Sequence, residues 1–199
     1  MARPVDTEKR EALAQQAFEH IKAQGFERVT MSSLARALEM KRSTLYWYFN
    51  DIHAIFEVVL ESLLKAQDAF IVERVRQQAH PLDLAMDYIR AVHGFYAQRA
   101  DVIVLLFQFW ALAGTSPQRA LAQLRAHHIP RRQLAVAALE AGIESGHIAA
   151  CDVEVVVSTL SAMVDGLLVQ LVVDPSIDLS ARHALIFNAI LEPLRLTPV

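Results

Sequence analysis

Residues 30–49 of the chain read TMSSLARALEMKRSTLYWYF, and this stretch decides the fold. Thr30 is of a type that caps helix N-termini, and apolar residues follow it at helical spacing. These residues are Met31, Leu34, Ala35 and Leu38. After a break at residues 39–40, a second helix is predicted over residues 42–48. Two helices this short are unstable alone, but with a tight turn between them and a small helical core beneath them they form a helix-turn-helix.

The predicted second helix carries an aromatic outward face. On a helical wheel Leu45 and Phe49 point towards the core, so Trp47 points almost directly outward. Tyr46 and Tyr48 then lie on the two shoulders of that face. An exposed tryptophan suits contact with a thymine methyl or a sugar, and tyrosine hydroxyls suit phosphates. The alternative interpretation is that these rings pack locally on a neighbouring helix.

The candidate DNA-binding residues come from both short helices and their N-terminal ends. They are Thr30, Ser32, Lys41, Arg42, Ser43, Thr44, Tyr46, Trp47 and Tyr48. Lys41 and Arg42 stand at the N-terminal tip of the second helix, where a recognition helix meets double-stranded DNA. The formal net charge is −3, yet the first 50 residues carry a net positive charge and the rest a net negative one. A polyanion is therefore expected to bind the N-terminal part.

The rest of the sequence is also predicted to be helical, which makes the fold class all-α with about nine helices. One helix precedes the quoted stretch, from residue 6 or 7 to Gly25, and another follows it to about residue 78. Later helices are expected at residues 82–98, 102–113, 117–144 with a break or kink at Pro130, 153–173 and 180–192. We expect a DNA-binding head over residues 1–50 and a body for ligand binding and dimerisation over residues 51–199.

The composition is that of an ordered globular protein with extra apolar surface. Hydrophobic residues make up 54% and charged residues 21% of 199 residues, and the mean hydropathy is +0.26. The apolar part of the charge-free run from Val102 is too short to cross a membrane, and the polar start of the chain does not resemble a signal peptide. The single cysteine excludes a disulfide within the chain. A cytoplasmic protein without membrane contact is predicted.

The excess apolar surface is explained most simply by a dimer interface. The predicted helix over residues 153–173 has apolar residues around most of its circumference, so it is expected to be buried on both sides. Together with the helix over residues 180–192 it is expected to form a four-helix interface with a symmetry mate.

Aromatic residues concentrate in the two helices predicted over residues 82–98 and 102–113. Core packing is the simpler interpretation of any one of them, but as a group they are expected to line an apolar pocket. The candidate ligand-binding residues are Tyr88, Phe95, Phe107, Trp110 and Met163. The expected ligand is a small, largely apolar molecule.

The motifs of the N-terminal part resemble those of the tetracycline-repressor (TetR) family of transcriptional regulators. The resemblance rests on residues 30–38, on the run Thr-Leu-Tyr-Trp-Tyr-Phe at 44–49, and on Ala17-Phe18 followed by Gly25-Phe26. It covers about residues 7 to 60. It implies a repressor that binds a palindromic operator as a homodimer through helices 8 and 9 and is released by a small ligand.

The sequence departs from the family pattern at three positions. Glu39 occupies the turn where the family usually has glycine, and a residue with a Cβ is strained there if φ is positive. Lys41 stands where a serine usually caps the second helix. Ile52 replaces the lysine that usually binds phosphate at the start of the fourth helix.

A helical-bundle enzyme and a helical adaptor protein are the alternative functions. The sequence has no Glu-x-x-His pair on facing helices, no Gly-x-Ser-x-Gly motif and no phosphate loop. The adjacent His127 and His128 point about 100° apart on a helix, so they do not converge on one metal. No enzymatic activity, cofactor or metal is therefore expected. An adaptor would leave the basic head and the outward Trp47 without a role.

Overall fold

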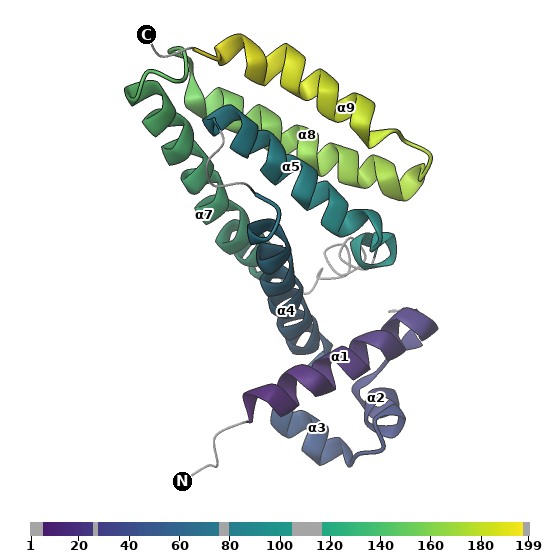
Figure 1. Ribbon diagram of the computed structural model, residues 1–199. Helices are drawn as coiled ribbons and strands as arrows, with labels where there is room; N and C mark the ends of the chain where they lie inside the picture. Colours follow the sequence, from purple (N-terminus) through teal and green to yellow (C-terminus); the bar gives the residue numbers. More distant parts are fainter. Residues whose placement is uncertain (1–5, 26–27, 76–79, 105–116, 197–199) are drawn as a thin grey trace. The chain divides into compact units, whose positions relative to one another are not determined.

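The computed structural model describes residues 6–25, 28–75, 80–104 and 117–196, and within these ranges it contains helices but no strand (Figure 1). The all-α prediction is confirmed. The described chain forms two compact units. The head unit holds the described residues up to Asp68 together with Val104, and the body unit holds the other described residues.

The head unit contains α1 (Thr7–Gln24), α2 (Met31–Ala37), α3 (Arg42–Tyr48) and most of α4 (Ile52–Val72). Asp6 caps α1 by accepting the backbone N–H of Lys9 at 3.2 Å. Asp51 caps α4 in the same way, accepting the N–H of Ala54 at 2.7 Å. Such caps satisfy backbone donors that have no partner inside the helix.

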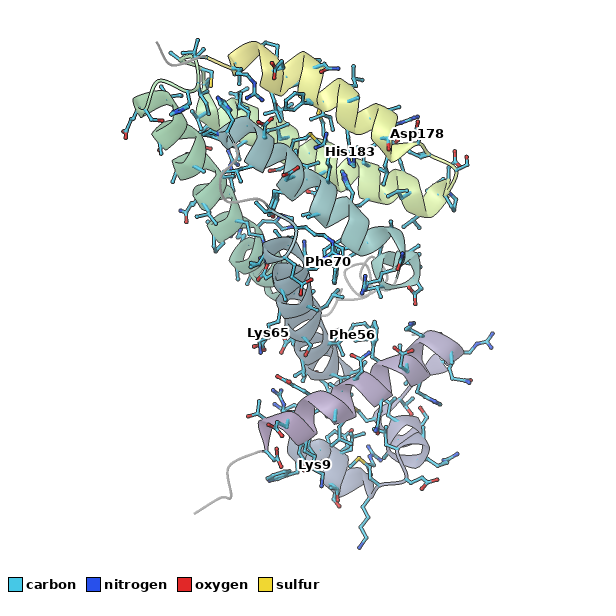
Figure 2. The ribbon with its side chains drawn as sticks, viewed as in Figure 1. Lys9, Phe56, Lys65, Phe70, Asp178 and His183 are labelled. Atoms are coloured by element: carbon cyan, nitrogen blue, oxygen red, sulfur yellow. The ribbon has the colours of Figure 1, made fainter. Side chains whose placement is uncertain are left out.

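One hydrophobic core holds the four helices of the head unit together. Its fully buried members include Ala14, Ala17, Ile21, Leu34, Leu45, Phe49 and Ile55. The rings of Phe18 and Phe56 meet edge to face with centroids 5.6 Å apart, joining α1 to α4; Figure 2 labels Phe56. Leu13 of α1 is partly buried and packs against this core.

The body unit contains α5 (Pro81–Ala97), α7 (Pro117–Glu144), α8 (Val153–Val173) and α9 (Leu179–Ile186). The helices α5, α7 and α8 pack against one another around a second core. That core includes Leu82, Met86, Ile89, Leu139, Ile148, Val157, Leu160, Ile186 and Leu191. After α9 the chain continues through one π turn at Phe187–Leu191 and a 3₁₀ turn at Glu192–Leu194.

The helices α4 and α7 differ from the sequence-based expectation. The helix α4 ends at Val72 instead of about residue 78. Arg74 folds back there, donating to the carbonyl of Phe70 at 3.2 Å with its guanidinium 3.4 Å from the ring centroid. The helix α7 is not broken at Pro130, which is exposed, so water can solvate the carbonyl that proline leaves without a partner. Most of the helix expected at residues 102–113 lies outside the described residues.

A buried pair of histidines joins three helices of the body unit. Nδ1 of His93 lies 2.8 Å from Nε2 of His183, and Nε2 of His93 lies 3.1 Å from the carbonyl oxygen of Val164. Because a carbonyl only accepts, His93 donates to Val164 from Nε2 and accepts the N–H of His183 at Nδ1. The ring planes differ by 12° and the centroids are 5.0 Å apart, so the rings lie edge to edge in nearly one plane. The chain of hydrogen bonds therefore runs from α9 through α5 to α8.

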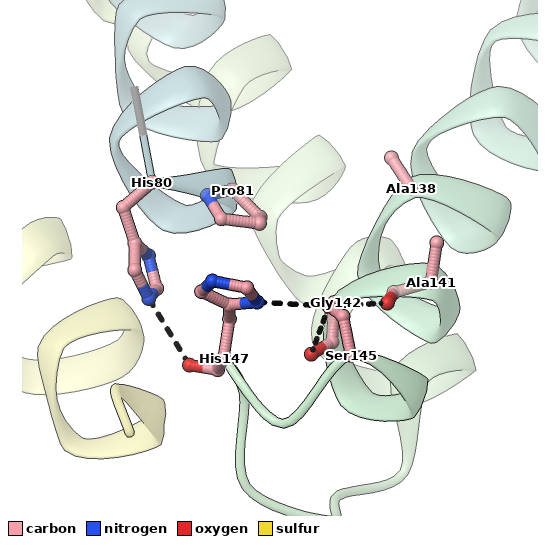
Figure 3. A pocket seen from close by; sticks show the side chains of 7 residues that line it. All are labelled: His80, Pro81, Ala138, Ala141, Gly142, Ser145 and His147. Carbon is pink, nitrogen blue, oxygen red and sulfur yellow. Dashed lines mark hydrogen bonds between the residues drawn. The ribbon is translucent and has the colours of Figure 1, made fainter. Parts of the chain in front are cut away.

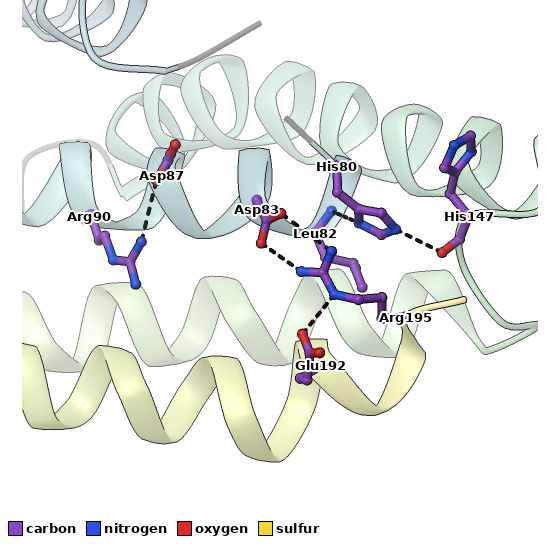
Figure 4. Close-up of polar contacts among 8 residues, drawn as sticks. All are labelled: His80, Leu82, Asp83, Asp87, Arg90, His147, Glu192 and Arg195. Atoms are coloured by element: carbon purple, nitrogen blue, oxygen red, sulfur yellow. Dashed lines mark hydrogen bonds and ion pairs between the residues drawn. The ribbon is translucent and has the colours of Figure 1, made fainter. Parts of the chain in front are cut away.

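The C-terminal segment is clasped onto the first turn of α5 (Figure 4). The two terminal nitrogens of Arg195 donate to the Asp83 carboxylate at 2.6 and 3.4 Å, and its Nε donates to the Glu192 carboxylate at 2.8 Å. Two backbone bonds pair the segment with residues 147–149, from the N–H of Ala149 to Leu194 and from the N–H of Leu196 to His147. We refer to these contacts as the C-terminal clasp.

Among the described helices, only α8 is long and apolar enough to cross a membrane by length and composition. It is also a helix of the body core, since Val153, Val157, Leu160 and Leu167 are buried there. A single helix of this kind is weak evidence for a membrane span.

Candidate DNA-binding surface

The first short helix, α2, begins at a complete capping box. The hydroxyl of Thr30 accepts the N–H of Ser33 at 3.1 Å, and the hydroxyl oxygen of Ser33 accepts the N–H of Thr30 at 2.8 Å. This reciprocal pair fixes where α2 starts. The buried face of α2 consists of Met31, Leu34 and Ala35, which leaves the candidate residues Thr30 and Ser32 exposed.

The turn between α2 and α3 places Glu39 in the left-handed region with φ 51°, the only such non-glycine residue among those described. The N–H of Met40 donates to Ala35 at 2.9 Å and that of Glu39 to Arg36 at 3.1 Å. These two bonds form the Schellman arrangement that usually has glycine at the left-handed position. The strain expected if φ were positive is thus present at Glu39.

The second short helix, α3, presents a basic and aromatic surface to solvent. Its exposed candidate residues are Lys41, Arg42, Ser43, Thr44, Tyr46 and Trp47. Lys41 makes no side-chain cap, in keeping with the absence of the usual serine. Arg42 donates to the hydroxyl of Tyr46 at 3.3 Å with its guanidinium 5.3 Å from that ring. The first turn of α3 carries no acidic residue, so its tip favours an anion.

Trp47 is 46% exposed, as the helical wheel predicts, with its ring edge-on to Tyr48 at 4.6 Å between centroids. Tyr48 itself is not on an exposed shoulder. It is 8% exposed and belongs to the head core, because it follows Leu45 by three residues and shares its buried face. The predicted phosphate contact of Tyr48 therefore stays a prediction that its burial does not favour.

Sequence reasoning missed one side chain that contacts α3. Arg10, on the first turns of α1, donates from Nε to the carbonyl of Tyr48 at 3.2 Å. The two residues are far apart in the sequence, and the only local signal was a basic residue next to the buried stripe of α1.

The candidate ligand-binding residues do not gather around one hollow in the described part of the chain. Tyr88 and Met163 are 36% and 37% exposed, whereas Phe95 is 2% exposed and packs against the rings of Phe70 and Tyr96. Phe107 and Trp110 lie outside the described residues.

The described part of the body unit includes two hollows. The larger, about 500 Å³, is open to solvent (Figure 3). It is lined by His80, Pro81, Ala138, Ala141, Gly142, Ser145 and His147. The smaller, about 250 Å³, is lined almost wholly by apolar side chains. Its residues are Tyr96, Ala97, Ala100, Ile103, Leu171, Pro175, Ile177 and Leu179. Within the described residues, no three metal-ligating side chains converge.

Two short helices joined by a tight turn, with an exposed basic and aromatic second helix, define a helix-turn-helix DNA-binding protein. The family model of bacterial regulatory proteins of the tetR family matches residues 13–59. The C-terminal model of BetI-type transcriptional repressors matches residues 81–192. The chain belongs to the TetR family and is a DNA-binding transcriptional regulator.

Solved structures of the same fold agree with this assignment. A TetR transcription regulator from Haloarcula marismortui superposes with a TM-score of 0.80 at 15% identity, covering 96% of this chain and all of that one. The fatty acid degradation regulator FadR from Bacillus halodurans gives 0.68 at 15% identity, covering 98% and 100%. The ketosteroid transcriptional regulator KstR2 of Mycobacterium tuberculosis gives 0.62 at 18%, covering 95% and 96%. A comparison with curated proteins finds no match.

Proposed function

We propose that the protein is a repressor that binds an inverted-repeat operator as a homodimer, with α3 of each protomer in the major groove. The observation that carries this proposal is the exposed face of α3, where Arg42, Tyr46 and Trp47 have no place in the head core. Arg42 and Trp47 are the proposed base and sugar contacts. The proposed phosphate contacts come from residues at both helix starts and from the tyrosines. These are Thr30, Ser32, Lys41, Ser43, Thr44, Tyr46 and the hydroxyl of Tyr48.

Selection of duplexes from a random-sequence library by the purified protein tests this proposal. The expected product is an inverted repeat whose half-site centres are separated by about one turn of DNA, 34–36 Å, or a multiple of it, and whose binding weakens steeply with salt. Enrichment of a single half-site, or retention independent of salt, would contradict it.

The proposed dimer interface consists of α8 and α9. Along α8, small and apolar residues recur at helical spacing, all exposed except the half-buried Gly166: Val155, Thr159, Ala162, Gly166, Val169 and Val173. On α9, Leu185 is 66% exposed. A continuous apolar stripe of this length in a single chain supports burial by a second copy. Sedimentation of the wild-type protein at micromolar concentration tests it, since a monomer there would refute a dimer.

The proposed effector is a small, largely apolar molecule that binds the body. Similarity to the FadR and KstR2 structures supports this class, because those proteins are described as regulators of fatty acid degradation and as a ketosteroid regulator. The proposed effector contacts remain Tyr88, Phe95, Phe107, Trp110 and Met163. Of these, the buried Phe95 would line the inside of the effector site. The apolar hollow of about 250 Å³ supports space for part of such a ligand.

The proposed division of labour follows the sequence, with DNA binding in residues 1–50 and effector binding and dimerisation in residues 51–199. The compact head unit extends further, to Asp68, because the first turns of α4 complete its core. We further propose that the protein acts by binding alone, without catalysis, in the cytoplasm.

A further inference from the structure

A side chain of α1 holds the C-terminal end of the helix that presents Arg42 and Trp47. Nε of Arg10 donates to the backbone carbonyl of Tyr48 at 3.2 Å. The guanidinium carbon of Arg10 also lies 5.4 Å from the ring centroid of Phe49, which is 1% exposed. Arg10 directly follows Lys9, which Figure 2 labels, in the part of α1 capped by Asp6.

The helix α3 depends on such a contact more than a longer helix would. It has only seven residues, so its unsatisfied terminal carbonyls are a large share of its backbone. It has no basic residue in its own last turn and no side-chain cap at its start. A guanidinium at the C-terminal end therefore supplies both a hydrogen bond and the charge that the helix dipole favours there.

The contacts of Arg10 differ from those of other cations in the head unit. Lys22 pairs with Glu19 and Lys65 with Glu61, as is common between neighbouring charges on a helix surface. No carboxylate of the described residues pairs with Arg10, and its described side-chain contacts all lie at the end of α3. A directional hydrogen bond restricts how α3 rotates and slides on the core, whereas the apolar contacts of Leu45 and Phe49 restrict mainly its depth.

We infer that Arg10 is a positioning residue for base recognition: its bond to Tyr48 fixes the orientation of α3, and through it the reach of Arg42 and Trp47. The inference rests on the proposed role of α3 in the operator. It assigns Arg10 to specificity and not to a phosphate contact. Loss of the bond lowers affinity for the operator and leaves affinity for unrelated DNA nearly unchanged, because only base readout requires the exact orientation.

The test compares Arg10→Lys and Arg10→Met with the wild type on two probes. One probe is the duplex that the wild type enriches from a random library, and the other is a scrambled duplex of the same length. Lysine keeps the charge but lacks the planar fork that bonds Tyr48 while lying over Phe49, and methionine keeps only the aliphatic bulk. We expect both variants to lose roughly tenfold in affinity for the enriched duplex. Their salt slopes and their affinity for the scrambled duplex should stay close to those of the wild type.

Lys9→Met is the matched control, since Lys9 is an exposed neighbouring cation whose side chain makes no hydrogen bond or ion pair with α3 among the described residues. A phosphate contact by Arg10 would instead give an Arg10→Lys variant like the wild type and an Arg10→Met variant whose salt slope falls by about 1 on both probes. A purely stabilising role would lower the melting temperature but leave both affinities unchanged well below it. Either result overturns the inference, and enrichment by the wild type shows separately whether the operator proposal holds.

Discussion

Glu39 occupies a backbone conformation that glycine adopts without strain. Its φ of 51° lies at the left-handed position of the turn between α2 and α3. A residue with a Cβ loses about 1 kcal/mol there relative to glycine. We therefore expect Glu39→Gly to raise the free energy of unfolding by roughly that amount in chemical denaturation. Glu39→Ala removes the carboxylate but keeps the Cβ, so an equal gain from alanine would show that charge and not strain is responsible.

Arg42 and Trp47 are exposed on α3 and are the proposed base and sugar contacts. If Arg42 meets a base edge, Arg42→Ala should weaken operator binding by about 1–3 kcal/mol and relax the preference at one base pair. If it meets phosphate, the salt slope should fall by about 1 with little change in preference. Titration of labelled operator at several salt concentrations distinguishes the two. If both Arg42→Ala and Trp47→Ala bind like the wild type, α3 does not read the operator.

The buried histidine pair makes stability depend on pH. Burial, the neighbouring His93 and the charge of Arg90 lower the pKa of His183 to about 4, and burial also lowers the pKa of His93. The unfolded chain, with an ordinary histidine pKa near 6.5, therefore takes up the proton first as the pH falls. The contribution of the neutral histidine pair to the free energy of unfolding is therefore complete above about pH 6.5, and it declines as the pH falls towards 4.

His183→Gln should flatten this dependence. Glutamine can still donate to Nδ1 of His93 but does not titrate, so the slope should fall by up to about 1.4 kcal/mol per pH unit between pH 4.5 and 6. Urea denaturation of both proteins at several pH values measures it. Other charged groups, including Asp165 on α8 and Arg90 on α5, are common to both proteins. Parallel curves would mean that His183 titrates alike in the folded and unfolded states.

At the scale of single helices, α8 offers a clean test of the dimer. A Cβ added to Gly166 meets nothing within 4 Å, so the chain itself has room for a larger side chain there. Gly166→Leu should leave helicity intact and yet convert the dimer to monomers, because the leucine would hold apart two closely packed helices. The dimer measured by sedimentation and the affinity for the operator should be lost together.

Leu134→Glu on α7 is the control for a change on an exposed apolar residue outside the proposed interface, since Leu134 is 73% exposed. It should leave the dimer intact. If the Gly166→Leu variant dimerises as tightly as the wild type, the interface does not lie on this stripe of α8.

The elements that could be predicted from the sequence are those defined by local signals. Asp6 and Thr30 each cap a helix where expected, and the spacing of apolar residues identified α2. Contacts between distant segments carry no such signal. The burial of Tyr48 depends on packing against other helices, and the return of Arg74 onto Phe70 ends α4 early.

The candidate DNA surface followed from a helical wheel because one exposed face of one short helix supplies most of it. The Arg10 contact could not be predicted, since it joins α1 to the end of α3 across the fold. The pairing of His93 with His183 likewise depends on how α5 and α9 pack. The proposed ligand contacts come from several helices, and their arrangement depends on the fold as a whole.

For the whole molecule, the central expectation is that effector and operator binding oppose each other. The chain passes from the head unit to the body unit within α4, so a ligand that favours a different orientation of α4 would change the spacing of the two heads in a dimer. It can do so only as far as it binds that state more tightly. A tenfold loss of operator affinity requires about 1.4 kcal/mol of coupling.

Fatty acids and steroids are the compounds to screen first for a rise in melting temperature. Compounds that stabilise the protein should also weaken operator binding in a titration with operator DNA. Stabilising compounds that leave operator affinity unchanged would contradict the coupling, whatever their position in the body.

The C-terminal clasp has a consequence for the order of events during translation. Arg195 and Leu196 leave the ribosome after every other described part of the body that they fasten, including Asp83 and residues 147–149. More than a hundred residues are therefore synthesised between Asp83, in the first turn of α5, and its ion-pair partner Arg195. The helices of the head emerge from the ribosome long before Arg195 does. A ribosome stalled shortly before Arg195 would present a nascent chain whose recognition helix is already formed and whose body is still unfastened.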